Sequence, residues 1–220
     1  MSDDEYTLID SLVDLPNLID FELINMAAGN HDATPSLPLQ DRRGNNWYAV
    51  AGNGHKFCFL TDDGEQTLGA VDHDPLIDRT GPYPIGAANP YWSAHYFNPG
   101  WLHEVLLTRA DYRLLLRERV VALFTGGGAL TTTPSLARWQ SRQAEVDPLV
   151  IAEAARWGDA GGIAYTRNTW LDEVGWVVGN WFPTRTATVV GQFAAHWWRV
   201  SGIGVAEEGY APSVRIGAGG

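Results

Sequence analysis

Apolar residues recur at intervals of three and four between Leu8 and Ala28, which is the spacing of one helix face. The pattern predicts a helix over 8–28 that closes at Gly29, because glycine after the last apolar position is a common helix C-cap. Pro16 lies where a proline in the first turn is tolerated. The chain is therefore expected to begin with a helix.

Two short runs rich in aromatic and branched residues, 47–50 and 56–60, flank the sequence Gly52-Asn53-Gly54. Asn-Gly between two such runs predicts a β-hairpin. The stretch 31–44 contains prolines, a glycine and polar residues, which indicates a loop. The longer stretch 61–99 also predicts irregular structure, and an irregular stretch of this length is usually functional.

From Trp101 onward the pattern indicates helices. The helix expected over 169–181 has two possible N-caps, Thr169 and the competing Thr166. The expected helices are 110–124, 133–157, 169–181 and 183–198. The pattern as a whole predicts an α+β fold, in which a small antiparallel hairpin or sheet lies beside a bundle of four or five helices.

Composition excludes several classes of protein. The 220 residues are 45% hydrophobic and 19% charged, which is typical of a folded domain rather than a disordered chain. The net charge of −11 argues against a nucleic-acid partner, because phosphate contacts need a basic surface. One cysteine, Cys58, rules out an internal disulfide framework and a multi-cysteine zinc site.

The two ends carry no recognisable targeting signal. No apolar run approaches the roughly 18 residues that span a bilayer, and the acidic start lacks the features of a signal peptide. The chain stops in the glycine-rich sequence 216–220 without a terminal element. We therefore expect a fragment of a longer protein, with 201–220 as a linker towards a following domain.

Acidic and amide residues gather at the ends of the predicted hairpin. Asp32 follows the first helix, Asn46 opens the first strand, and Asp63 and Glu65 follow the second. A hairpin brings the residue before one strand close to the residue after its partner, so Asn46 and Asp63 can face one point that Asp32 can join. Carboxylate and amide oxygens suit Mg²⁺. An Asp that accepts a hydroxyl proton, an Asn and a metal-holding Asp are the parts of kinase phosphoryl transfer, although Asp32 and Asn46 are farther apart than in the usual motif.

The sequence resembles the second half of the spore coat protein H (CotH) kinase domain over roughly residues 5 to 200. The resemblance rests on the order and spacing of several short motifs. Those motifs are Gly29-Asn30-His31-Asp32, Asn46-Trp47-Tyr48, Phe57-Cys58-Phe59, the stretch from Asp63 to Leu68, Tyr112-Arg113, 127–131, 152–159, Trp170, Phe182-Pro183-Thr184-Arg185-Thr186, Gln192 and Tyr210-Ala211-Pro212.

The resemblance implies an atypical protein kinase, with a fold like a kinase C-lobe, that transfers phosphate from Mg²⁺–ATP to Ser or Thr of a secreted or surface protein. It assigns the catalytic role to Asp32. It gives Mg²⁺ and nucleotide binding to Asp63 and Asn46, with Glu65 as a supporting acid. It also implies an extracellular or cell-surface location and a following β domain.

Two departures from the family are visible. Ala33 occupies the position of the family's usual tryptophan. No stretch corresponds to the family's N-terminal lobe, which supplies the cover over the nucleotide and a phosphate-pairing lysine. The single lysine, Lys56, lies beside the hairpin turn instead. Whether this chain acts as an enzyme without that lobe is left open by the sequence.

Structural alternatives compete with each functional role. Asp32 can be a turn residue, Asp63 part of a polar turn, and Asn46 a strand start without a ligand. The loop residue His31 can tune Asp32 or be solvated. Trp139, Trp157, Trp170, Trp176 and Trp181 fit core positions better than a stacking platform. The rival functions are a surface module that binds protein or glycan without catalysis, and a domain stabilised by Ca²⁺.

Overall fold

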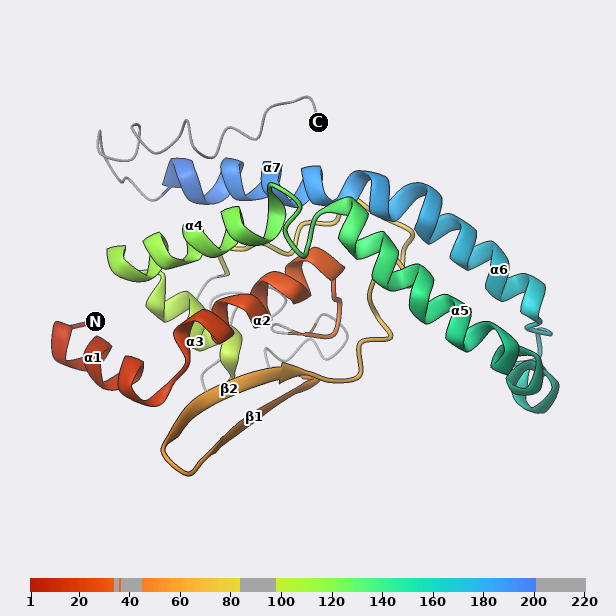
Figure 1. Ribbon diagram of the computed structural model, residues 1–220, viewed down its shortest axis with the longest axis horizontal. Helices are drawn as coiled ribbons and strands as arrows, with labels where there is room; N and C mark the ends of the chain where they lie inside the picture. Colours follow the sequence, from red (N-terminus) through yellow and green to blue (C-terminus); the bar gives the residue numbers. More distant parts are fainter. Residues whose placement is uncertain (34–35, 37–44, 84–97, 201–220) are drawn as a thin grey trace.

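A computed structural model describes residues 1–33, 36, 45–83 and 98–200 (Figure 1). Within these residues the chain is α+β and mainly helical, with one two-stranded antiparallel sheet, which confirms the predicted fold class. The elements are α1 (Asp3–Leu12), α2 (Leu15–Ala28), β1 (Trp47–Gly52), β2 (His55–Thr61), α3 (Pro99–Leu106), α4 (Ala110–Phe124), α5 (Thr132–Trp157), α6 (Arg167–Trp176), the π-helical turn η1 (Val177–Trp181) and α7 (Phe182–Val200). The expected linker 201–220 lies outside the described residues.

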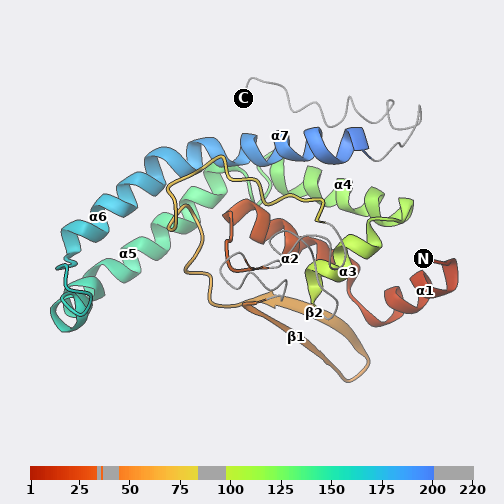
Figure 2. The ribbon, with the colours of Figure 1, turned by 180° about the vertical axis from the view of Figure 1, so that it is seen from behind.

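Helix α2 is the centre of the fold. It packs against α3, α4 and α7, and β2 lies against it as well (Figures 1 and 2). The core contains the buried side chains Leu18, Ile19, Leu23, Leu106, Leu116, Val120, Val189 and Phe193. Burial of these side chains on α2 holds in place the segment that leads to Asp32.

The predicted first helix is divided in two. Asp14 accepts a hydrogen bond from the Asn17 N–H (3.0 Å) and so caps a new helix, α2, while α1 ends at Leu12. Pro16 lies in the first turn of α2, as predicted. Gly29 caps its end with a φ of 61°, which confirms the predicted helix end.

The predicted hairpin is confirmed. Trp47 pairs with Thr61 and Gly52 with His55, around a turn in which Asn53 and Gly54 have φ values of 52° and 80°. This left-handed pair is what Asn-Gly provides at low cost. The sheet is anchored through Phe59, whose ring lies 6.1 Å from that of Phe21 on α2.

Helices α5 and α6 form an arm that extends away from the body (Figures 1 and 2). The N-cap of α6 is the competing residue Thr166, and Thr169 instead completes its capping box. The N-cap of α5 is Thr131 rather than Thr133. The last two predicted helices, 169–181 and 183–198, correspond to α6 and α7, which η1 joins into one continuous run.

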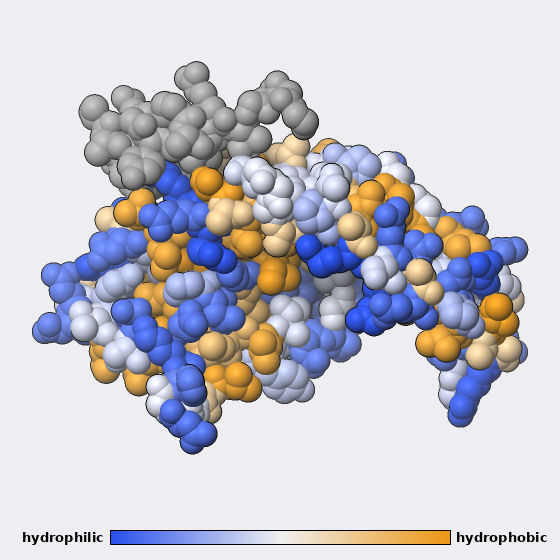
Figure 3. Space-filling view, in the orientation of Figure 1, coloured by the Kyte–Doolittle hydropathy of each residue, from blue (hydrophilic) through white to orange (hydrophobic). Residues whose placement is uncertain are grey.

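The tryptophans of the arm differ from the sequence expectation. Trp181 is buried, but Trp139, Trp170 and Trp176 are only half-buried, and 55% of Trp157 is exposed. The prediction of a core position is therefore wrong for Trp157. The physical reason is that a two-helix arm has no third layer to cover its tip, which stands clear of the body in Figure 3.

Gly69 fits under the arm only because it lacks a side chain. Its φ is 79°, and a Cβ atom there would lie 2.5 Å from the Trp176 ring. We expect Gly69→Ala to lower the free energy of unfolding by about 2–3 kcal/mol, since left-handed strain and a clash act together. Gly126 has a φ of 58° with open space around it, so Gly126→Ala should cost only about 1 kcal/mol. Equal urea midpoints for the two variants would contradict the steric part of this prediction.

Candidate functional site

Asp32 is held at the end of α2 by a chain of buried amides. The Asp32 N–H donates to Asn30 Oδ1 (2.9 Å), and Asn30 Nδ2 donates to Asn25 Oδ1 (3.0 Å). Asn25 in turn donates to the Phe21 carbonyl one helical turn earlier (3.0 Å). The backbone at Asp32 is thereby fixed to the helix that forms the centre of the core.

The Asp32 carboxylate is buried and accepts several hydrogen bonds, and only 8% of the residue is exposed. Oδ1 accepts from the Ser36 hydroxyl. Oδ2 accepts from Asn45 Nδ2 (2.9 Å) and from Asn46 Nδ2 (3.2 Å). These donors hold the carboxylate in one orientation. Its contact with Ser36 demonstrates that Oδ1 lies within reach of a serine hydroxyl.

Asn46 links Asp32 to the far end of the hairpin. Its Nδ2 also donates to the Asp63 carbonyl (3.0 Å), and its own carbonyl accepts from the Asp62 N–H (3.0 Å). Asn46 and Asp63 both have left-handed φ values, 57° and 47°, which close the hairpin base around this contact. The predicted proximity of Asp32, Asn46 and Asp63 is confirmed, while the chemical roles of these residues stay predictions.

A second carboxylate lies next to Asp63. Glu65 raises the pKa of Asp63 above its ordinary value, first through a side-chain hydrogen bond and then through its charge. Asp62 and Asp32 add smaller repulsive contributions in the same direction. Acidic groups are thus gathered at the hairpin base, and no basic side chain contributes to the pKa shift of Asp63.

The donors at this point suit a hard cation only in part. Among the described residues, no group of three or more His, Cys, Asp or Glu side chains is arranged to hold a metal ion. Asp63 and Glu65 provide two adjacent carboxylates, and the Asn46 side chain bonds Asp32 and Asp63 through its Nδ2 rather than through its oxygen. Mg²⁺ commonly takes one or two carboxylates and completes its shell with water and phosphate. The residues present therefore fit Mg²⁺ together with a phosphate, and not a cation held by protein alone.

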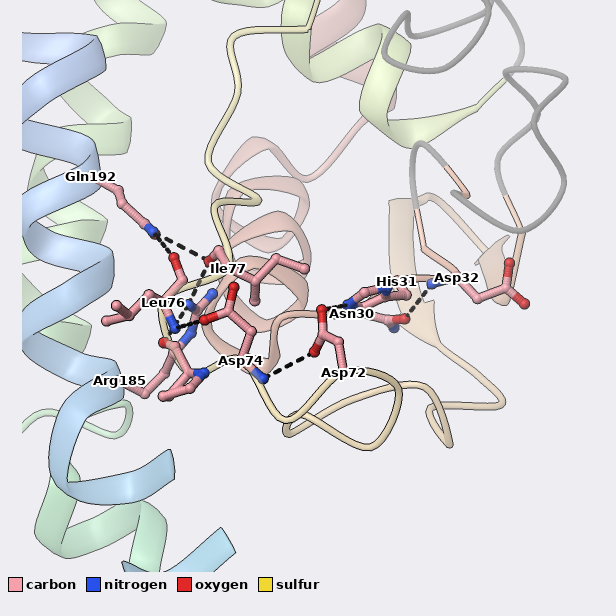
Figure 4. Close-up of polar contacts among 10 residues, drawn as sticks. Asn30, His31, Asp32, Asp72, Asp74, Leu76, Ile77, Arg185 and Gln192 are labelled. Atoms are coloured by element: carbon pink, nitrogen blue, oxygen red, sulfur yellow. Dashed lines mark hydrogen bonds and ion pairs between the residues drawn. The ribbon is translucent and has the colours of Figure 1, made fainter. Parts of the chain in front are cut away.

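The His31 ring faces Asp72 rather than the Asp32 carboxylate. Its Nε2 lies 3.3 Å from Asp72 Oδ2, and Figure 4 shows His31 near Asp72 while Asp32 extends away from it. Burial lowers the pKa of His31, and the charge of Asp72 partly opposes that shift. The His31 side chain is thus associated with the loop after the hairpin rather than with the Asp32 carboxylate.

Arg185 of α7 holds the backbone before Asp32 from the other side (Figure 4). It is buried, and its guanidinium donates to the carbonyls of Met26 and Ala27 at the end of α2. It also donates to the carbonyls of Pro75 (3.2 Å) and Ile77 (2.6 Å). One side chain therefore joins α7, the end of α2 and the loop after the hairpin.

Sequence reasoning missed several residues that position Asp32. Asn25, Asn30, Asn45 and Ser36 received no role, and Arg185 entered only as part of a motif. A signal was available for Asn25, because it is the one polar residue in the apolar stretch from Leu23 to Ala28 at the end of the helix. Such a residue needs a hydrogen-bond partner inside the protein. The contacts of Arg185 span distant parts of the chain and have no local signal.

Comparison of the chain with family models, curated proteins and solved structures finds no match in any of the three. The helices of the described part include none that is both long and apolar enough to cross a membrane.

Proposed function

We propose that this chain carries the catalytic and metal-binding half of a CotH-like protein kinase, which transfers phosphate from Mg²⁺–ATP to Ser or Thr of a protein. The observation that carries the proposal is the side chain of Asn46, which bonds both the Asp32 carboxylate and the Asp63 carbonyl. This contact joins a buried, oriented carboxylate to an exposed acidic pair. The carboxylate can orient the attacking hydroxyl and the acidic pair can hold the metal ion, which are two of the roles that phosphoryl transfer requires of a protein.

The roles of the residues follow from their surroundings. The amides of Asn45 and Asn46 orient Asp32 so that Oδ1, which accepts a hydrogen bond from the Ser36 hydroxyl, can take the proton of an incoming hydroxyl. Asp63 and Glu65 would hold Mg²⁺, which neutralises the charge of the phosphates when it is bound. The raised pKa of Asp63 supports this role, because a cation relieves the repulsion between the two carboxylates.

The proposal is tested by the thermal stability of the chain with Mg²⁺ alone, ATP alone, and both together. A ligand that binds only the folded state at a hundredfold excess over Kd stabilises it by about 2.7 kcal/mol. We expect Mg²⁺ and ATP together to raise the melting temperature, and Asp63→Asn to remove that increase. Asp32→Asn should keep the increase, because Asp32 orients the hydroxyl and does not hold the metal.

Transfer of labelled phosphate to Ser- and Thr-containing proteins is the second measurement. It should require both Asp32 and Asp63. A melting temperature that rises equally with Mg²⁺–ATP in the parent chain and in Asp63→Asn would overturn the assignment of the metal site.

The family resemblance also leads us to propose an extracellular or cell-surface location.

A non-catalytic binding module is the second candidate function. The observation that favours it is the half-buried or exposed state of four tryptophans on the arm, which a core role does not explain. A rise in melting temperature with Ca²⁺ but no nucleotide effect would instead favour the calcium-stabilised domain.

A further inference from the structure

A cleft of about 930 Å³ lies between the arm and the loop that follows the hairpin. We call it the arm cleft and define it by six of its lining residues: Glu65 and Asp72 on the loop, Trp139 on α5, and Trp170, Glu173 and Trp176 on α6. In Figures 1 and 2 this loop passes beside the arm, between α2 and the η1 region. The cleft therefore has one wall of irregular chain and one wall of helix.

The helical wall of the arm cleft is aromatic. Trp139, Trp170 and Trp176 are each half-buried, so part of every indole ring is accessible. Rigid aromatic rings at the edge of a cleft offer broad contact area and a negative ring face, which attracts cations. Trp181, the fully buried member of this group, does not line the cleft.

Three carboxylates line the arm cleft, and one histidine, His73, lines it beside them. Glu65, Asp72 and Glu173 line it, and no lysine or arginine is among the described residues that do. The whole chain carries a net charge of −11, so its wider field has the same sign. An anionic ligand is disfavoured in such a place, and a cation is attracted.

His73 already displays the kind of contact that the arm cleft offers. Its ring stacks on Trp176, with centroids 4.5 Å apart, and its Nε2 lies 2.8 Å from Glu173 Oε2. A nitrogen group is thus held between an indole face and a carboxylate. An alkylammonium group that displaces the His73 ring would make the same pair of contacts, with its methylene groups against the neighbouring tryptophans.

We propose that the arm cleft binds an aliphatic diamine or polyamine, with its ammonium groups at the carboxylates and its methylene chain along the tryptophans. Charge complementarity and aromatic walls select this occupant over a nucleotide or a neutral chain. The arm cleft shares Glu65 with the proposed Mg²⁺ site, but the test contains neither nucleotide nor Mg²⁺, so its outcome is distinguishable from that of phosphoryl transfer.

The test is calorimetric titration of the full chain with spermidine and with 1,4-diaminobutane, at low and moderate salt and pH 7. We expect saturable binding that weakens as salt rises. The variants Glu173→Gln and Trp170→Leu should each weaken it roughly three- to thirtyfold, which is the range of a lost cation–π or charge contact. Circular dichroism of both variants establishes that they fold.

Matched controls come from the outer part of the same arm. Glu153 and Trp157 line only a neighbouring groove, so Glu153→Gln and Trp157→Leu should leave spermidine binding unchanged. Because Trp170 and Glu173 line that groove as well, equal loss in the controls would place the amine in the neighbouring groove and overturn the site. Equal binding of 1,4-butanediol would overturn the cation, and absence of binding at millimolar spermidine would overturn the proposal. Binding of a lysine-rich peptide but not of free amines would replace the occupant with a protein.

Discussion

Arg185→Leu is expected to lower the free energy of unfolding by about 3–5 kcal/mol, the range for removing one partner from a buried charged contact. Arg185 is 4% exposed and donates to carbonyls on α2 and on the loop after the hairpin. Leucine fills part of the space but leaves those carbonyls without their donor, and each such loss is costly when buried. The measurement is urea unfolding followed by circular dichroism.

The charge of Arg185 also contributes to stability, because its guanidinium lies at the C-terminal end of α2. A cation there stabilises the helix dipole, and the guanidinium additionally lies 4.9 Å from the centre of the Trp181 ring. Burial lowers the pKa of Arg185 to about 10, so it stays protonated at pH 7. Lysine keeps the charge but not the planar set of donors, and Arg185→Lys should therefore lie between the parent chain and Arg185→Leu.

A matched control for Arg185 is Arg142, which is exposed on α5 and pairs with the likewise exposed Glu145. Arg142→Leu should change the free energy of unfolding by less than about 1 kcal/mol. A similar loss in both variants would mean that α7 is not held to the end of α2 through Arg185. The position of Asp32 would then have to depend on its amide contacts alone.

The sequence predicted the parts of this fold whose signals are local. The Asn53-Gly54 turn, the C-cap at Gly29 and the periodic helices 110–124 and 133–157 each depend on residues next to one another. The proximity of Asn46 to Asp63 also followed, because a hairpin fixes which residues meet at its base. Prediction failed where distant segments decide the outcome, as for Trp157 at the uncovered tip, and it also missed the local cap at Asp14 that divides the first helix.

The same distinction applies to the candidate site. Asp32, Asn46, Asp63 and Glu65 could be named because each lies at the end of a recognisable element. The amides that orient Asp32 could not be assigned, since Asn25 and Asn30 act only after α2 has folded. A buried hydrogen bond of this kind depends on geometry rather than on composition.

A buried carboxyl group on α3 should make the stability of this protein fall as pH rises from about 4.5 to about 8. Glu104 is 7% exposed, and its Oε1 accepts from the Tyr83 N–H (2.8 Å). Burial raises its pKa from 4.5 to about 8. Between those pH values the folded state holds a proton that the unfolded state has released, so the free energy of unfolding decreases with rising pH.

The adjacent His103 acts in the opposite direction at lower pH. It is buried, its Nδ1 lies 2.9 Å from the Tyr112 hydroxyl, and burial lowers its pKa to about 3. Between pH 3 and 6.5 the unfolded state binds the proton instead, so this group adds stability as pH rises. The effects of His103 and Glu104 on the free energy of unfolding oppose each other only below pH 6.5. Above pH 6.5 only the decrease from Glu104 remains.

Glu104→Gln should remove that decrease, because the amide is neutral in both states and its oxygen can still accept from Tyr83. Relative to the parent chain, the variant should gain roughly 4 kcal/mol of unfolding free energy between pH 5 and pH 9. Urea midpoints at pH 5, 7 and 9 measure this difference. Glu118 is exposed on α4, so Glu118→Gln should follow the parent at every pH. Parallel curves for Glu104→Gln and the parent would show that Glu104 ionises in the folded protein without cost, and that water reaches it beneath α3.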